Sequence, residues 1–331
     1  MRLDAATWLL VGAGLGFTFL NGYNGSASVV GSMVASGAMN ARRALLLAGA
    51  AELCGPLLFG VAVAGTIGRG VVDPGQLTLA VLVAAILGAV AWSAVAGWIG
   101  VPTSSTHALV GGLIGAALAA GGTGAVLWRS LAGVFLALGA APALGLVGGY
   151  AYMKAMMRVG VFLTPAVNVY LKRAQIVTSA LIALGHGANE AQKGMGLIAA
   201  GLVASGATDR FYVPGWVQLA CAVAIALGVA LGGQTTLRTV GARIFTIRPV
   251  HGFAVQGTTA LIMVGASLLG GPASTNQVAT SAIFGVGSAE RLTKVRWEVG
   301  EAILTAWLVT VPTAALVAAL LYWAGRAVGL R

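Results

Sequence analysis

Long apolar runs separated by short polar gaps dominate the chain. Apolar segments lie near residues 6–20, 26–39, 43–66, 76–99, 108–120, 125–151, 174–185, 195–207, 212–233, 252–270, 278–288 and 300–324. A membrane-spanning helix needs about 20 apolar residues. Several segments are shorter or are interrupted by Gly, Pro and Ser, namely 6–39, 101–120, 174–207 and 271–288. This pattern predicts an all-α integral membrane protein with broken helices and two re-entrant helical hairpins that line a protein-enclosed cavity.

The composition agrees with a membrane protein. Of 331 residues, 58% are hydrophobic and only 8% are charged, whereas a soluble domain carries about 25% charged residues. We therefore expect a multi-pass protein of the cytoplasmic membrane, in contact with lipid. The net charge of +11 comes mainly from Lys and Arg in the short gaps, where such residues orient spans and meet anionic lipid. No basic face with interleaved aromatic residues is evident, so a nucleic-acid partner is not expected.

Two halves of the chain repeat each other. Asn21–Ser28 aligns with His186–Lys193, which pairs Asn24 with Asn189, and Val101–Ala108 aligns with Gly271–Val278, which pairs Ser104 with Ser274. The order and spacing of the matches predict a first transmembrane repeat over 1–153, a basic connecting loop over 154–173 and a second repeat over 174–331. With an odd number of spans in each half, the repeats are inverted and the substrate lies near the membrane midplane.

A polar island over residues 184–196 interrupts the second repeat. It contains His186, Asn189, Glu190, Gln192 and Lys193. Ionisable groups at membrane depth are costly and usually mark a path for ions or substrate. Glu190 could complete a cation site or carry a proton, and the structural alternative is a buried ion pair with Lys193, three residues further along the helix.

The Ser/Thr-rich segments Thr103–Thr106 and Ser274–Asn276 each follow a proline closely and are expected to open a helix. A helix N-terminus offers free backbone N–H groups and a partial positive charge, which together bind oxyanions. For a single cluster, helix packing is the simpler interpretation, but two clusters at repeat-related positions favour a binding site. The residues expected to bind substrate are Asn24, Thr103, Ser104, Ser105, Thr106, Asn189, Gln192, Ser274, Thr275 and Asn276. Glu190 and Ser28 are expected to hold the coupling ion, and no metal cluster or other cofactor is expected.

At these residues the chain resembles the PiT-type inorganic phosphate transporter family. The resemblance rests on His186–Lys193, Pro102–His107, Gly65–Asp73, Pro272–Thr275 and Val286–Trp297, and it extends from about Phe17 to Trp307. It implies sodium- or proton-coupled uptake of inorganic phosphate across the cytoplasmic membrane by an inverted-repeat transporter, and a homodimer.

The chain departs from the family pattern at three places. In the first element Asn24-Gly25 replaces His-Asp and Ser28 replaces a later Asn, and in the second element Glu190 replaces an Asp. The first change brings the sodium site of the first half into question and leaves open a proton-coupled sulfate permease of the same fold. Phosphate can donate a hydrogen bond from its OH whereas sulfate cannot, so a buried acceptor such as Glu190 favours phosphate.

A channel and an enzyme are the two alternatives to a transporter. A channel would use similar pore chemistry, but its flux would not depend on a coupling ion. An enzyme would need a nucleophile with a base or a metal cluster, and the three histidines are too scattered in the sequence to form one. We therefore expect a secondary transporter and not an enzyme.

Overall fold

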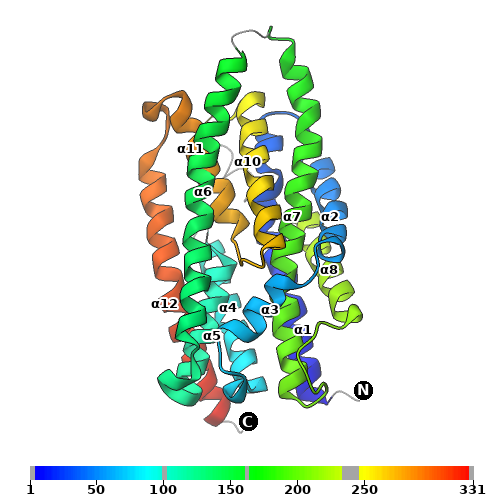
Figure 1. Ribbon diagram of the computed structural model, residues 1–331, viewed down its shortest axis with the longest axis vertical. Coiled ribbons are helices and arrows are strands. Elements are labelled where there is room, and N and C mark those ends of the chain that lie inside the picture. Colours follow the sequence, from blue (N-terminus) through cyan, green and yellow to red (C-terminus); the bar gives the residue numbers. More distant parts are fainter. Residues whose placement is uncertain (1–3, 99–102, 161–163, 233–245, 328–331) are drawn as a thin grey trace.

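The protein is an elongated bundle of helices that run roughly along its long axis (Figure 1). The computed structural model describes residues 4–98, 103–160, 164–232 and 246–327. The start of α1 and the end of α12 lie at the same end of the bundle. The helices are α1 (Ala5–Ala35), α2 (Ala41–Leu58), α3 (Ala62–Gly70), α4 (Leu79–Trp98), α5 (Ser105–Gly121), α6 (Trp128–Gly160), α7 (Val167–Ala204), α8 (Gly215–Ala230), α10 (Pro249–Leu268), α11 (Thr275–Glu290) and α12 (Trp297–Ala327).

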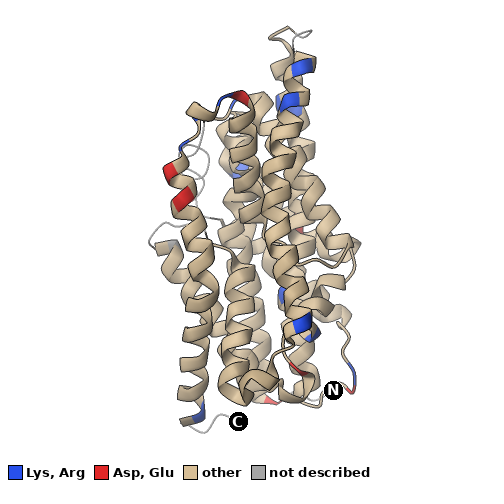
Figure 2. Ribbon diagram, turned by 60° about the vertical axis from the view of Figure 1, so that its left-hand side comes forward, with Lys and Arg blue, Asp and Glu red and all other residues tan. Residues whose placement is uncertain are grey.

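Several helices are suited to crossing a membrane. Among the described residues, five helices are long and apolar enough, and a sixth span results if the bent pair α2 and α3 counts as one. Most charged residues lie toward the two ends of the bundle, and its middle is largely uncharged (Figure 2). The chain is therefore a multi-pass membrane protein, in agreement with its composition.

The expected breaks in residues 6–39 and 174–207 do not occur. Helices α1 and α7 run without interruption through both polar motifs. The glycines there bring neighbouring backbones close together: a Cβ on Gly187 would lie 2.6 Å from the carbonyl oxygen of Glu52, and one on Gly196 would lie 2.6 Å from that of Ala64. A true break separates α2 from α3, which are bent by 74°. Glycine in these segments therefore serves close packing and not chain reversal.

Two helical hairpins face each other tip to tip in the middle of the bundle. The hairpin of α4 and α5 occupies one end and the hairpin of α10 and α11 the other (Figure 1). Their tips touch directly, because Thr106 Oγ1 donates to the carbonyl of Ala273 at 3.2 Å and Asn276 Nδ2 donates to the carbonyl of Thr103 at 3.2 Å. The two hairpins that the sequence predicted are thus present, and residues at the start of α5 contact residues at the start of α11.

Each hairpin packs on the long helix of the other half. Gly115 on α5 lies against the backbone of Ala315 on α12, and Gly285 on α11 lies against the backbone of Leu146 on α6. Gly115 and Gly285 are a repeat-related pair in the sequence, so the same close contact occurs twice. Helices from the first and second halves of the chain are consequently packed against each other.

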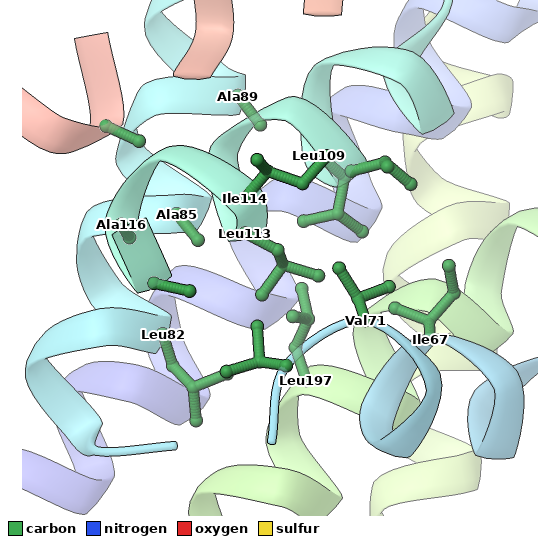
Figure 3. Packing of buried hydrophobic residues seen from close by; sticks show 14 of the residues in the cluster. Ile67, Val71, Leu82, Ala85, Ala89, Leu109, Leu113, Ile114, Ala116 and Leu197 are labelled. Atoms are coloured by element: carbon green, nitrogen blue, oxygen red, sulfur yellow. The ribbon is translucent and has the colours of Figure 1, made fainter. Parts of the chain in front are cut away.

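Apolar side chains fill the lower hairpin. Leu109 and Leu113 of α5 point toward Leu197 of α7 and toward Ile67 and Val71 at the end of α3 (Figure 3). All five are at most 2% exposed. This packing fixes the position of α5 along α7, so that the start of α5 lies beside the polar residues of α7.

The connecting segment is shorter than expected. The range 154–173 was predicted as a basic loop, but α6 continues to Gly160 and α7 begins at Val167. The basic residues Lys154, Arg158 and Lys172 therefore lie on helix ends that extend beyond the apolar part of the bundle, where charged side chains can reach water or lipid headgroups.

Candidate functional site

The Glu190 carboxylate is the centre of a buried polar site. It lies on α7 and is 2% exposed. Its Oε2 atom is 2.6 Å from Lys193 Nζ, one helical turn away, and accepts a hydrogen bond from Asn21 Nδ2 of α1 at 2.8 Å. Ser105, the first residue of α5, donates its hydroxyl to the same oxygen at 3.3 Å. Groups from three helices thus converge on one carboxylate oxygen.

Lys193 links this carboxylate to both hairpin tips. Its ammonium is fully buried. Besides Glu190, it donates to the hydroxyl of Thr106 in the first turn of α5 and to the carbonyl of Ala273, which precedes α11, at 2.9 Å. All three donor positions of the ammonium are therefore used. One buried ammonium thus binds both hairpins, α5 through the Thr106 hydroxyl and the turn before α11 through the Ala273 carbonyl.

Asn189 fixes the turn of the second hairpin. Its Nδ2 atom donates to the carbonyl of Gly271 at 3.0 Å, and its Oδ1 atom accepts from the backbone N–H of Ala273 at 3.1 Å. Buried backbone groups need hydrogen-bond partners, and here the amide side chain of Asn189 supplies the partners that a helix or strand would otherwise provide. Non-helical backbone at this depth is stabilised by the side chain of α7.

A second chain of hydrogen bonds connects α1 with both tips. Ser28 donates its hydroxyl to Asn276 Oδ1 at 2.7 Å, and Asn276 donates in turn to the carbonyl of Thr103. Ser28, Thr103 and Asn276 were each expected in the site, and the structure brings them together.

The helix openings at Ser104 and Ser274 match the sequence expectation closely. Ser104 caps α5 by accepting the backbone N–H of His107 at 3.2 Å. Ser274 holds the same position before α11 with similar backbone angles, φ −111° and ψ 111°, against −100° and 113° for Ser104. Within the described residues, the hydroxyl of Ser274 makes no such cap. Both serines are buried, each directly before the first turn of its helix.

Two expected residues take no part in the contacts described so far. Asn24 is half-buried on the face of α1 one turn beyond Asn21. Gln192 accepts from the backbone N–H of Ala64 at 3.1 Å, at the opening of α3, on a different face of α7 from Glu190. The remaining expected residue, Thr275, begins α11, and its backbone faces the Glu190 carboxylate.

Sequence reasoning missed Asn21 as a site residue and treated Lys193 mainly as a partner of Glu190. A signal for Asn21 was present, because the repeat alignment places it opposite His186, another polar residue. The bond to Glu190 depends on the rotation of α1 against α7, and that rotation is set by packing and not by spacing along the chain.

The site can bind an oxyanion. Glu190 is itself an oxyanion, and the groups around it are an ammonium, an amide, a hydroxyl and the first turns of α5 and α11. These are the donors that phosphate or sulfate needs when it loses its hydration shell. No group of three or more His, Cys, Asp or Glu side chains suited to a metal ion occurs in the described part of the chain.

The fold and the site together define a polytopic membrane protein with a buried polar centre between two hairpins. A sequence profile of the phosphate transporter family matches residues 21–318. The chain belongs to this family, whose members are transporters and not enzymes.

Known relatives cover almost the whole chain. The protein of Rhizobium meliloti (strain 1021) described as "Probable low-affinity inorganic phosphate transporter" is 39% identical over 317 residues, which is 95% of each chain. A Bacillus subtilis (strain 168) protein of the same description is 36% identical over 323 residues, 96% of each chain. A solved structure described as "The sodium-dependent phosphate transporter" superposes with a TM-score of 0.88 at 28% identity and covers 98% of this chain and 100% of that one.

Proposed function

We propose that the protein imports inorganic phosphate across the cytoplasmic membrane by symport with a cation. The observation that carries the proposal is the position of the Glu190 carboxylate, which receives donors from the openings of both hairpins and from Lys193. A site that already solvates one buried oxyanion supplies the chemistry for another.

The coupling follows from competition for these donors. A sodium ion or proton that neutralises Glu190 weakens its bonds to Lys193, Asn21 and Ser105. The ammonium and the two helix openings then become available to phosphate. Without the cation, Glu190 retains these donors and repels the anion. Substrate and cation thus favour each other's binding, as linkage between two sites requires.

Most of the residues expected to bind substrate are kept in the proposal. Phosphate lies between the two hairpin tips, and Glu190 with Ser28 holds the coupling ion. The anion is bound by Asn24, Thr103, Ser104, Ser105, Thr106, Asn189, Ser274, Thr275 and Asn276, to which we add Asn21 and Lys193, whereas Gln192 binds the start of α3 and is left out. A protonated phosphate OH can donate to Glu190, which favours phosphate over sulfate.

The coupling ion is sodium or a proton. The solved relative is sodium-dependent by its description, which supports sodium. In this chain Glu190, Asn21 and Ser28 offer several oxygen atoms, the type of ligand that a hard cation prefers.

Transport requires that the site opens to each side in turn. We propose that residues 1–153 and 174–331 are inverted repeats, supported by the paired contacts Gly115 with Ala315 and Gly285 with Leu146. The exposed apolar helix faces contact membrane lipid, and we expect a homodimer.

The test is uptake of radiolabelled phosphate by proteoliposomes under an imposed sodium or proton gradient. We expect phosphate to accumulate above its external concentration, sulfate to compete poorly, and at least one of the two gradients to be required. Sulfate uptake that phosphate does not inhibit would identify the sulfate permease alternative, and flux independent of both gradients would indicate a channel.

A further inference from the structure

A second pair of ionisable residues is buried beside the Glu190 site. Glu52 of α2 and His186 of α7 are 0% and 1% exposed, and His186 Nδ1 lies 2.7 Å from Glu52 Oε1. His186 precedes Glu190 by four residues, so the two side chains lie about one helical turn apart on one face of α7. Neither is among the contacts that hold the hairpin tips.

Glu52 and His186 are each other's polar contact. Within the described part of the chain, neither carboxylate oxygen of Glu52 has a hydrogen-bond donor other than the His186 ring. The other ring nitrogen of His186 faces Gly25 of α1, where a Cβ would collide with Nε2. A buried charge without hydrogen-bond partners is costly. The net charge of the pair, which its number of protons sets, therefore affects the energy of the neighbouring charged groups.

We propose that the Glu52–His186 pair is a second cation site of the transporter and that its cation is a proton. With one proton shared between the carboxylate and the ring, the pair is neutral overall. Loss of that proton leaves Glu52 negative and His186 neutral. A sodium ion is unsuited to this position, because it needs several oxygen ligands and one carboxylate beside a ring nitrogen supplies too few.

Protonation of the pair favours anion binding nearby. Among the described residues, the charges that act on the pair are Glu190 and Lys193 on α7, while α1 faces it with the uncharged Gly25. Glu190 and Lys193 compensate each other, so a deprotonated Glu52–His186 pair adds one uncompensated negative charge. Proton uptake removes this charge before phosphate enters, and bound phosphate holds the proton in return.

This inference rests on the proposed phosphate transport and is tested separately from it. The first measurement is exchange of radiolabelled phosphate in proteoliposomes with equal pH and equal sodium on both sides, which needs a working substrate site but no driving gradient. The second is net accumulation driven by an acid-outside pH gradient with sodium equal on both sides. If wild-type protein shows no exchange, the proposed function itself fails.

The informative variants are Glu52→Gln and His186→Gln, with Glu301→Gln on the exposed face of α12 as the matched control. We expect both site variants to retain exchange and to lose at least tenfold in pH-driven accumulation, and the control to match wild type. Comparison at the same pH removes the effect of phosphate speciation. Undiminished pH-driven accumulation in the two variants would overturn the inference, and so would loss of exchange in both, since the pair would then serve the substrate site or the fold.

Discussion

Lys193 of α7 donates a hydrogen bond of 2.9 Å to the carbonyl of Ala273, which lies in the turn before α11. A side chain from the middle of one helix thus holds the tip of a hairpin far away in the sequence. The same ammonium is 2.6 Å from Glu190. The Glu190 carboxylate and the turn before α11 are therefore both held by the ammonium of Lys193.

Removal of Lys193 tests its double role. In Lys193→Met the buried Glu190 loses its counter-charge, and breaking such a pair costs about 3–5 kcal/mol. We expect a marked fall in the thermal unfolding temperature in detergent. The double variant Lys193→Met with Glu190→Gln should recover much of the stability but remain inactive in phosphate uptake. Active transport by the double variant would remove Lys193 from the anion site.

Glu190→Gln alone tests the coupling. Gln keeps the size of the side chain but cannot gain or lose a proton, and it binds sodium more weakly. We expect gradient-driven accumulation of phosphate to fall by at least tenfold, measured as the ratio of internal to external phosphate. Accumulation equal to that of wild type would contradict the role of Glu190 in coupling.

The two serines before the hairpin helices should differ in their effect on stability. Ser104→Ala removes a capping hydrogen bond and should lower the free energy of unfolding by about 1 kcal/mol. Ser274→Ala removes no such cap and should leave stability nearly unchanged. Both substitutions should raise the KM for phosphate, because both hydroxyls lie at the opening of an anion-binding helix. An unchanged KM in both variants would exclude them from the substrate site.

Asn189→Asp separates the two hydrogen bonds that fix the second turn. The carboxylate can still accept from Ala273, but it cannot donate to Gly271 and would face that carbonyl oxygen at about the same 3.0 Å separation. We expect at least a tenfold loss of phosphate uptake. Asn40→Asp is the control, since Asn40 caps α2 and Asp is an equally good cap. Equal activity of the two variants would show that the turn does not need Asn189.

Gly25→Ala should displace the His186 ring. A Cβ at residue 25 would lie 2.8 Å from His186 Cε1, and closer still to Nε2. Gly16 on the same helix has open space around it, so Gly16→Ala should be neutral or should raise stability by up to about 1 kcal/mol through helix propensity. Thermal unfolding of both variants in detergent distinguishes steric crowding at residue 25 from the general effect of Ala in α1.

The last residue of α11 gives a pH dependence outside the transport site. Partial burial alone would raise the pKa of Glu290, but the hydrogen bond from Lys294 and the charge of His251 outweigh it, so the pKa is lowered. A lowered pKa contributes stability that is present above the unfolded-state value and is lost as the pH falls through the folded-state value. Unfolding temperatures of wild type and Glu290→Gln should therefore converge below about pH 4. A constant difference at all pH values would contradict this.

The hairpins could be predicted because their signals are local. Pro followed by Ser and Thr starts a helix whatever lies around it, and α5 and α11 indeed begin at Ser105 and Thr275. Ser104 and Ser274, which the repeat aligns, have similar backbone angles, and the inverted repeat itself stays a prediction.

The continuity of α1 and α7 could not be predicted in the same way. Glycine at 187 or 196 is compatible with a broken helix and with close helix contact, and the difference lies in the neighbour. Here the neighbours are the backbones at Glu52 and Ala64. The bond between Asn21 and Glu190 likewise depends on how α1 meets α7, which no local pattern reports.

The exchange of partners between the halves has a consequence for synthesis of the protein. The face of α5 that contains Gly111 and Gly115 packs on Val311 and Ala315 of α12, so it has no native partner when it leaves the ribosome. At about 5–20 residues per second, α12 follows on the order of 10–40 seconds later. Until then, translocon components or lipid must cover this glycine face, and a ribosome that stalls before Trp297 leaves the first hairpin without the helix against which it folds.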